Sequence, residues 1–252
     1  MIENRVKERL LEGETVLGCF VRSPDATFAE YVASCGWDFL VFDEEHGSVG
    51  RGDVANLARA CERRSVTPIV RVSSGDTALV LRCLDGGAAG LHFPWISDAD
   101  QARRAVSATR YGPLGRRGLA GNRGTDWSVT TEATARANRS TLVVVQIETK
   151  EGVDNIEDVC SVEDVDVIFV GPTDLSQSLG VPGEYAHPLV VEAMETVAAA
   201  ARTSGKVFGL FAGTPEAALR GMEMGARYIA TGVEAVVGPA MVSFIQAMSG
   251  DR

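Results

Sequence analysis

The chain has 252 residues, of which 45% are hydrophobic and 23% are charged, and its formal net charge is -10. This length and composition are ordinary for a globular protein with a full hydrophobic core. The negative charge argues against general binding of nucleic acids or anionic membranes, because both require a positive field.

The pattern of apolar and cysteine residues favours a cytoplasmic protein. No apolar run approaches the roughly 20 residues that span a bilayer, and the first ten residues are charged and amphipathic, without the apolar region of a signal peptide. The five cysteines are scattered, odd in number and never in a C-x-x-C pair. This usage favours reduced thiols over a disulfide framework or a zinc site.

The first half of the chain alternates between short apolar runs and amphipathic stretches, which predict strands and helices respectively. In chain order, the expected strands are 15–21, 38–42, 67–72 and 89–93. The helices expected after them are 24–34, 49–64, 76–86 (with Asp76 as its cap and Gly86-Gly87 at its end) and 98–109.

The second half begins with an interruption, because residues 110–138 are rich in glycine and arginine and predict a long functional loop with one short helix. The expected strands that follow are 141–148, 166–171, 206–211 and 227–232. The expected helices are an alanine-rich helix that ends at Thr203, then 214–225 and 239–248.

Eight strands, each followed by a helix, predict a parallel sheet. Eight such units in about 250 residues fit a closed (β/α)₈ TIM barrel better than an open doubly wound sheet, and no G-x-G-x-x-G follows an early strand. No change in composition marks a domain boundary, so we expect residues 1–252 to form a single α/β barrel domain.

Two of the predicted strands deliver an acid at the same end. One finishes on Gln146 and Glu148, and the next runs into Gly171-Pro172-Thr173-Asp174. The carboxyl ends of barrel strands meet on one face, where such enzymes place their chemistry. Two carboxylates with free positions for water and substrate oxygens suit Mg²⁺ or Mn²⁺, whereas zinc prefers histidine or cysteine ligands.

Further charged residues are expected on the same rim. Asp43, Glu45 and His46 follow the second strand, and Arg71 ends the third. An arginine at the end of a buried strand is costly unless an anion or a carboxylate receives it. A histidine, an arginine and several acids on one rim predict an active site.

Each of these residues also has a plainer interpretation. Glu148 could be a helix-start acid, Asp174 an N-cap, and His46 a turn residue. Arg71 could form a structural ion pair with Asp43 or Glu45. The remaining histidines, for which we expect structural roles, are His92 and His187.

Four motifs carry a family resemblance. They are Asp-Phe-Leu-Val-Phe-Asp43-Glu-Glu45-His46-Gly, Pro-Ile-Val-Arg71-Val, Val-Gln146-Ile-Glu148-Thr and Phe-Val-Gly171-Pro172-Thr-Asp174-Leu-Ser. In this order they resemble the HpcH/HpaI family of metal-dependent, pyruvate-specific class II aldolases. The likeness extends over nearly the whole chain, including Arg110-Tyr-Gly-Pro-Leu-Gly-Arg-Arg-Gly118 and 226–234.

The resemblance implies a role for each site residue. Glu148 and Asp174 would hold a divalent metal, Mg²⁺ or Mn²⁺ with Co²⁺ as a further option, and no organic cofactor would be needed. Gln146 and the backbone of Gly171, Pro172 and Thr173 would position pyruvate. The resemblance further implies that His46 is the acid/base group and that Asp43 orients it. Glu45 would support the waters of the site, and Arg71 would stabilise the enolate and the alkoxide.

The resemblance also implies the reaction and the assembly. The pyruvate enolate would add reversibly to an aldehyde, so that 4-hydroxy-2-oxo acids are formed or cleaved. Family members are typically hexamers that exchange the last helix, so a homo-oligomer, a hexamer or a trimer, is expected. The apolar segment 239–248 fits that role, although it could equally pack on its own barrel.

Three other functions remain open from the sequence. A biosynthetic lyase or synthase of the same family could use the enolate in citrate-synthase-like or decarboxylative chemistry. A Schiff-base aldolase would need one of Lys7, Lys150 and Lys206, of which Lys150 is the candidate to test. A barrel that only binds a ligand would not need the acid/base histidine. The acceptor stays open, because Glu44 and the stretches 93–95 and 118–127 depart from the commoner family pattern.

Overall fold

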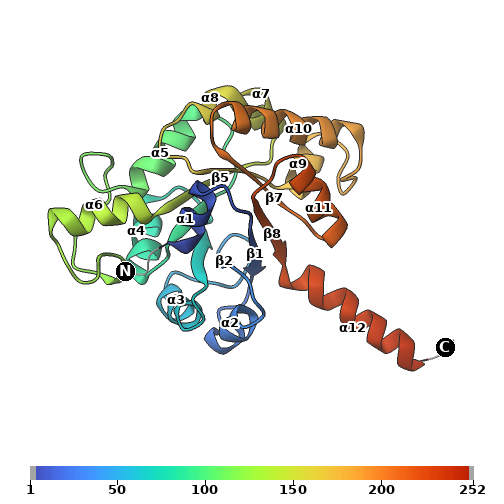
Figure 1. The fold of residues 1–252 in the computed structure, drawn as a ribbon, viewed down its shortest axis with the longest axis horizontal. Coiled ribbons are helices and arrows are strands. Elements are labelled where there is room, and N and C mark those ends of the chain that lie inside the picture. Colours follow the sequence, from blue (N-terminus) through green and yellow to red (C-terminus); the bar gives the residue numbers. More distant parts are fainter. Residues whose placement is uncertain (1–3, 250–252) are drawn as a thin grey trace.

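The computed structural model describes residues 4–249, and its centre is a closed barrel of eight parallel strands in sequence order (Figure 1). The first strand pairs with the last, with Gly18 beside Ala230, which closes the barrel. The strands are β1 (Val16–Val21), β2 (Phe39–Asp43), β3 (Thr67–Arg71), β4 (Gly90–Phe93), β5 (Leu142–Ile147), β6 (Val167–Val170), β7 (Val207–Phe211) and β8 (Tyr228–Gly232). The predicted (β/α)₈ fold is confirmed.

Helices surround the barrel (Figure 1). They are α1 (Arg5–Leu11), α2 (Ala26–Ala33), α3 (Val54–Glu62), α4 (Thr77–Gly86), α5 (Ala99–Thr109), α6 (Thr131–Ser140), α7 (Lys150–Asp154), α8 (Ile156–Cys160), α9 (Pro172–Ser178), α10 (Pro188–Thr203), α11 (Pro215–Glu223) and α12 (Val233–Ser249), with a 3₁₀ turn at Arg123–Thr125. The expected cap at Asp76 is present, since its side chain accepts from the N–H groups of Ala78 and Leu79.

Two predicted helix starts were wrong. α3 begins at Val54 and not at residue 49, because Gly50 and Gly52 are weak helix formers that leave the preceding segment as turns. α12 begins directly after β8, with Pro239 inside it. Proline is favoured at a helix start, so its position misled the prediction.

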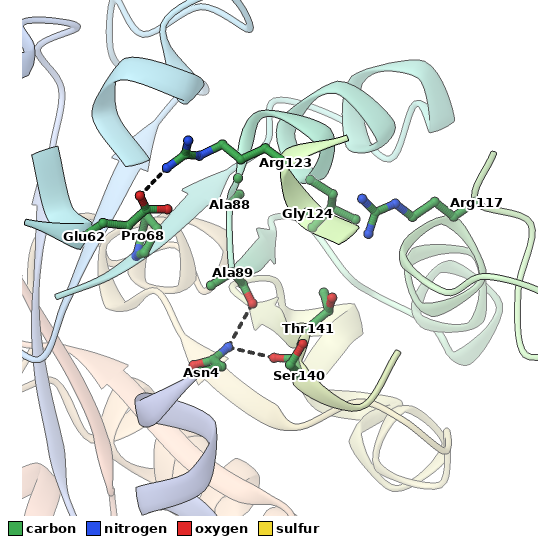
Figure 2. A pocket seen from close by; sticks show the side chains of 12 residues that line it. Asn4, Glu62, Pro68, Ala88, Ala89, Arg117, Arg123, Gly124, Ser140 and Thr141 are labelled. Atoms are coloured by element: carbon green, nitrogen blue, oxygen red, sulfur yellow. Dashed lines mark hydrogen bonds and ion pairs between the residues drawn. The ribbon is translucent and has the colours of Figure 1, made fainter. Parts of the chain in front are cut away.

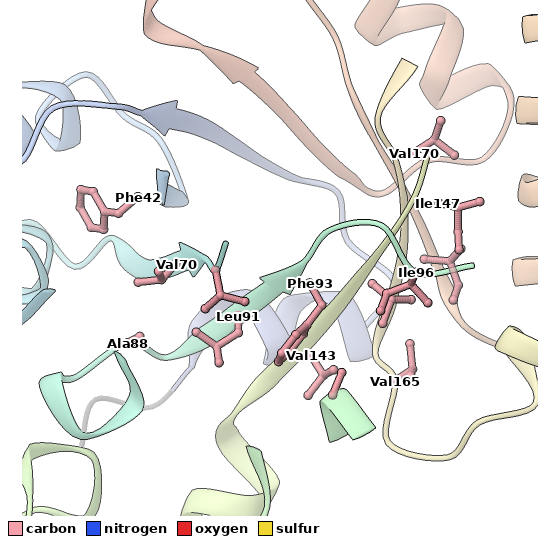
Figure 3. Packing of buried hydrophobic residues seen from close by; sticks show 14 of the residues in the cluster. Phe42, Val70, Ala88, Leu91, Phe93, Ile96, Val143, Ile147, Val165 and Val170 are labelled. Atoms are coloured by element: carbon pink, nitrogen blue, oxygen red, sulfur yellow. The ribbon is translucent and has the colours of Figure 1, made fainter. Parts of the chain in front are cut away.

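Side chains alternate between the inside and the outside of the barrel. In β2, Phe39 and Val41 belong to the inner cluster, whereas Leu40 and Phe42 pack outward against the helices. Figure 3 shows part of this outer layer. Gly18 makes room for the Phe39 ring, because a Cβ there would lie 2.1 Å from it. The same alternation, continued past the strand ends, turns the site residues inward.

The amino-terminal end of the barrel is closed by α1. Val6 and Leu10 of this helix join the inner cluster, and the Asn4 side chain donates to the carbonyls of Ala89 and Ser140 (Figure 2). The cavity at this end has a volume of only about 40 Å³, room for water but not for a substrate.

α12 projects away from the barrel (Figure 1) and has no buried residue. Its exposed large apolar side chains are Val236, Val237, Met241, Val242, Phe244, Ile245 and Met248. Such a surface is typical of a helix that packs against another protein chain. No helix within residues 4–249 has the length and apolar character needed to cross a membrane.

Candidate active site

A cavity of about 280 Å³ opens at the carboxyl ends of the strands. Its lining residues are Phe20, Arg22, His46, Arg71, Gln146, Glu148, Phe169, Gly171, Pro172, Thr173, Asp174, Phe211, Gly232, Glu234 and Ala235. All the predicted site residues except Asp43 and Glu45 belong to this set. Those two acids do not line the cavity, but they contact the Arg71 side chain, which does. The structure therefore brings the predicted site together.

Glu148 is the most constrained acid of the cavity. It is 1% exposed, and its Oε1 accepts from the Trp95 backbone N–H at 2.7 Å, while its Oε2 accepts from Gln146 Nε2 at 2.9 Å. Burial, together with the nearby charges of Asp174 and Glu45, raises the pKa of Glu148 to about 7, although its two hydrogen bonds act in the opposite direction. The surroundings of Glu148 thus disfavour its ionised form unless a positive charge lies nearby.

The plainer interpretations of the two acids do not fit their positions. Thr149 caps α7 with its side chain, so Glu148 is free to face the cavity. Gly171 occupies the N-cap position of α9, and Asp174 follows in the first turn of that helix. Asp174 therefore faces the same cavity as Glu148 without serving as a cap.

The donor set suits a hard divalent cation. Within residues 4–249, no group of three or more histidine, cysteine, aspartate and glutamate side chains could hold an ion by itself, so two carboxylates would leave positions for water and substrate oxygens. Gly171 keeps one of those carboxylates accessible, because a Cβ there would lie 2.6 Å from Glu148 Oε2. The residues present therefore fit an open Mg²⁺ or Mn²⁺ site.

Arg71 lines the cavity and contacts two acids. Its Nε and Nη2 donate to the two Asp43 oxygens at 2.9 and 2.7 Å, and its Nη1 lies 3.2 Å from Glu45 Oε2. Burial alone would raise the pKa of Asp43, but the hydrogen bonds and charge of Arg71 hold it below its ordinary value. The ion pair that the sequence left open exists, and Arg71 also borders the cavity.

His46 is held through its backbone. Its N–H donates to Asp43 Oδ1 at 3.2 Å, and its ring Nε2 lies 4.0 Å from Glu45 Oε2. The described contacts of Asp43 thus fix the main chain of His46, and the side chain of Glu45 is the acid nearest to its ring. The imidazole is half-exposed and lines the cavity.

Trp95 is a site residue that sequence reasoning did not identify. It has a positive φ of 58°, which is unusual for a bulky side chain. In this conformation its backbone N–H meets Glu148, and its indole Nε1 donates to Glu45 Oε1 at 2.8 Å. Trp95 therefore links the two acids, and only its place in an atypical stretch, Phe93-Pro94-Trp95, drew attention to it.

Aromatic side chains form the floor of the cavity. The Phe20 ring lies 6.3 Å from that of Phe169 and 6.0 Å from that of Phe211, and Arg71 Cζ lies 5.0 Å from the Phe20 ring centre. This floor excludes water from below the charged groups, and a lower local dielectric strengthens their interactions with a bound anion. The alternation of side-chain direction along the strands is the sequence pattern from which these aromatic residues could have been predicted.

The three lysines are not among the described residues that line the cavity. Lys7 pairs with Asp166 at the amino-terminal end, and Lys206 donates to the Val165 carbonyl. Lys150, the one candidate for a Schiff base, is exposed and paired with Asp154. A lysine-based mechanism has no support in this arrangement.

We expect the metal-free protein to lose stability as the pH rises. Because the pKa of Glu148 is raised from 4.5 to about 7, the folded protein retains a proton that the unfolded chain has already released. This contribution is fully present below about pH 4.5, and it is lost as the pH rises through about 7, a change of at most roughly 3 kcal/mol. Thermal unfolding with a chelator should show the wild type losing stability relative to Glu148→Gln over this range. A pH-independent difference would contradict the assignment.

Comparisons with known proteins give consistent results. The sequence model of the family described as HpcH/HpaI aldolase/citrate lyase matches residues 16–237. The 2-keto-3-deoxy-L-rhamnonate aldolase of Escherichia coli O157:H7 is 36% identical over 239 residues, 94% of this chain and 90% of that protein. A HpcH/HpaI aldolase/citrate lyase family protein from Burkholderia cenocepacia J2315 has a TM-score of 0.92 at 36% identity, covering 98% of this chain and 100% of that one. Citrate synthase SbnG has a TM-score of 0.87 at 31% identity, covering 96% of each chain.

Proposed function

Because this chain belongs to the HpcH/HpaI aldolase/citrate lyase family, we propose that it is a class II, divalent-metal-dependent aldolase that acts on pyruvate. It is a carbon–carbon lyase that forms the pyruvate enolate and adds it reversibly to an aldehyde. The reverse reaction cleaves a 4-hydroxy-2-oxo acid. The observation that carries this proposal is the cavity that joins buried Glu148, Asp174, Arg71 and His46.

Glu148 and Asp174 would hold the metal, Mg²⁺ or Mn²⁺ with Co²⁺ as a further option. When bound, such an ion supplies Lewis-acid stabilisation of the negative charge that develops on a substrate oxygen. The raised pKa of Glu148 supports this role, since a cation would remove the cost of ionising a buried acid.

Pyruvate would lie between Gln146 and the start of α9. Gln146 borders the cavity with its amide. In the first turn of α9 the N–H groups of Thr173 and Asp174 have no intrahelical acceptor and are available to a carboxylate. These N–H groups support the expected binding of the 2-oxo acid by the backbone of the Gly171-Pro172-Thr173 segment.

His46 and Arg71 would carry out the proton and charge steps. His46 accepts a proton from the pyruvate methyl carbon and returns one to the alkoxide after the carbon–carbon bond has formed. Arg71, fixed by Asp43, presents its guanidinium to the enolate and then to the alkoxide. Glu45 accepts from Trp95 and lies beside both Arg71 and His46, so it positions the two groups relative to each other.

The test is proton NMR of pyruvate in D₂O with metal-stripped enzyme, before and after addition of Mg²⁺. We expect metal-dependent loss of the methyl signal, because enolate formation exchanges these protons, and little loss in His46→Ala. Exchange that needs no metal and disappears in Lys150→Ala would establish a Schiff base. Binding of metal and pyruvate without exchange would indicate a binding protein.

The runner-up is a synthase that uses the same enolate. Citrate synthase SbnG shares the fold at 31% identity, but the relatives at 36% identity include a protein named as an aldolase. Arg22, Thr173 and Glu234 also line the cavity, and their polar side chains suit a hydroxylated aldehyde. A synthase would form product from an activated or decarboxylating co-substrate and not from an aldehyde.

We further propose a homo-oligomer, a hexamer or a trimer, in which the barrel is one domain and α12 packs against a second copy. The exposed apolar side chains of α12 support this. A monomer in sedimentation experiments would contradict it. A cytoplasmic location agrees with five cysteines that are all unpaired in the described structure.

A further inference from the structure

A continuous line of hydrogen bonds runs through the barrel interior to Glu148. The Tyr228 hydroxyl lies 2.8 Å from His92 Nε2, and His92 Nδ1 lies 3.0 Å from Gln146 Oε1. Gln146 Nε2 then donates to Glu148 Oε2 at 2.9 Å. All four residues are at most 1% exposed, so none of these contacts is open to bulk solvent.

The chemistry of the two ends fixes the direction of this line. The Gln146 NH₂ group faces Glu148 and its carbonyl oxygen faces His92, which is the orientation that an ionised Glu148 requires because a carboxylate only accepts hydrogen bonds. His92 must then carry its proton on Nδ1, which leaves Nε2 to accept from the Tyr228 hydroxyl. A Gln146 amide turned the other way would place its oxygen against the Glu148 carboxylate.

The surroundings hold His92 in this one arrangement. Its ring packs edge-on against Phe20 and Phe169, with centroid separations of 5.6 and 5.0 Å. Tyr228 is in turn stacked on Phe39 at 4.3 Å. Burial lowers the pKa of His92 to about 3, so the ring stays neutral at any working pH.

We propose that His92, backed by Tyr228, is a positioning residue of the active site that acts through the amide of Gln146. It keeps one Gln146 N–H on Glu148 and aims the other at the cavity, where a 2-oxo acid would accept it. The inference rests on the proposed function for the identity of that ligand. The hydrogen-bond direction itself does not depend on it.

The alternative is a purely structural role, in which His92 only provides hydrogen bonds to buried polar groups. Three variants separate the two roles. His92→Leu removes the donor to Gln146, His92→Asn keeps an amide N–H near the place of Nδ1, and Tyr228→Phe keeps the stack on Phe39 without the hydroxyl. His187→Leu, at the start of α10, is the matched control for loss of a histidine outside the cavity.

The first measurement is the KM and kcat of pyruvate methyl exchange, together with Mn²⁺ affinity by titration. We expect His92→Leu to raise KM and weaken Mn²⁺ binding by roughly 10- to 100-fold, as for other groups that orient metal ligands, with a smaller change in kcat. His92→Asn should recover most of both, and Tyr228→Phe should fall between them. Equal effects of the leucine and asparagine variants, following only their thermal stability, would overturn the proposal.

The second measurement needs neither metal nor turnover. The chain has three histidines, so ¹⁵N-histidine NMR of the wild type and His92→Asn identifies the His92 signals. We expect the Nδ1–H tautomer at mildly alkaline pH, whereas the Nε2–H tautomer would reverse the line and refute the inference. If the wild type shows this tautomer but never exchanges pyruvate protons, the proposed function fails while the hydrogen-bond direction stands.

Discussion

Replacing Glu148 by glutamine is expected to slow metal-dependent exchange of the pyruvate methyl protons about a thousandfold, equivalent to about 4 kcal/mol of transition-state stabilisation. The change preserves the shape of a side chain that is almost fully buried, but it removes the charge that would hold the cation. Mn²⁺ affinity should fall in parallel, which titration of the metal-free protein can measure.

The matched control is Glu151→Gln. Glu151 lies three residues further along, in α7, and is exposed, so the same chemical change should leave Mn²⁺ affinity and exchange near the wild-type values. Glu148→Gln relieves the cost of the buried charge but turns an NH₂ group towards one of the two N–H donors, those of Trp95 and Gln146, so thermal unfolding of this variant is measured beside its metal affinity. Wild-type metal affinity in Glu148→Gln would refute its role as a ligand.

Replacing Arg71 by lysine is expected to slow exchange by roughly 100- to 1,000-fold, the range for loss of one preorganised donor to a developing oxyanion. Lysine keeps the positive charge but cannot form the paired bonds that Arg71 makes to both oxygens of Asp43. The remaining ammonium can still pair with Asp43, so the protein should fold while the cavity loses its fixed guanidinium.

Exchange rates and thermal unfolding of Arg71→Lys would be measured beside Arg63→Lys, whose side chain is 78% exposed. If Arg71→Lys loses stability but exchanges pyruvate protons as fast as the wild type, Arg71 is only the structural partner of Asp43. If it loses exchange and keeps its stability, the arginine contributes to the reaction directly.

The places of Asp43, Arg71 and Glu148 in the fold were predictable, because each residue lies at the end of a strand or just beyond it. Asp43 and Arg71 end adjacent strands and lie side by side in the register of β2 and β3. Glu148 continues the inward alternation of β5 that includes Gln146. Side chains along a strand alternate in direction with a period of two residues, and the carboxyl ends of all the strands lie on one face of the barrel. These two rules are enough to bring such residues together.

What escaped prediction depends on contacts between distant residues or on backbone conformation. His92 and Tyr228 are 136 positions apart in the chain, and no local pattern reveals that they meet. Trp95 adopts a positive φ that its residue type disfavours. The long loop after α5 was recognised, but the ten-residue length of α6 within it was not, because its mostly polar sequence gives little apolar periodicity.

The distribution of thiols has a practical consequence for physical studies of the assembly. Cys19, Cys61, Cys83 and Cys160 are buried, and burial raises the pKa of each thiol, which suppresses the reactive thiolate. Cys35, just after α2, is exposed. A maleimide spin label or fluorophore should therefore attach at one defined point per subunit without any engineered cysteine. Distances between labels on neighbouring copies would then give the arrangement of the barrels in solution.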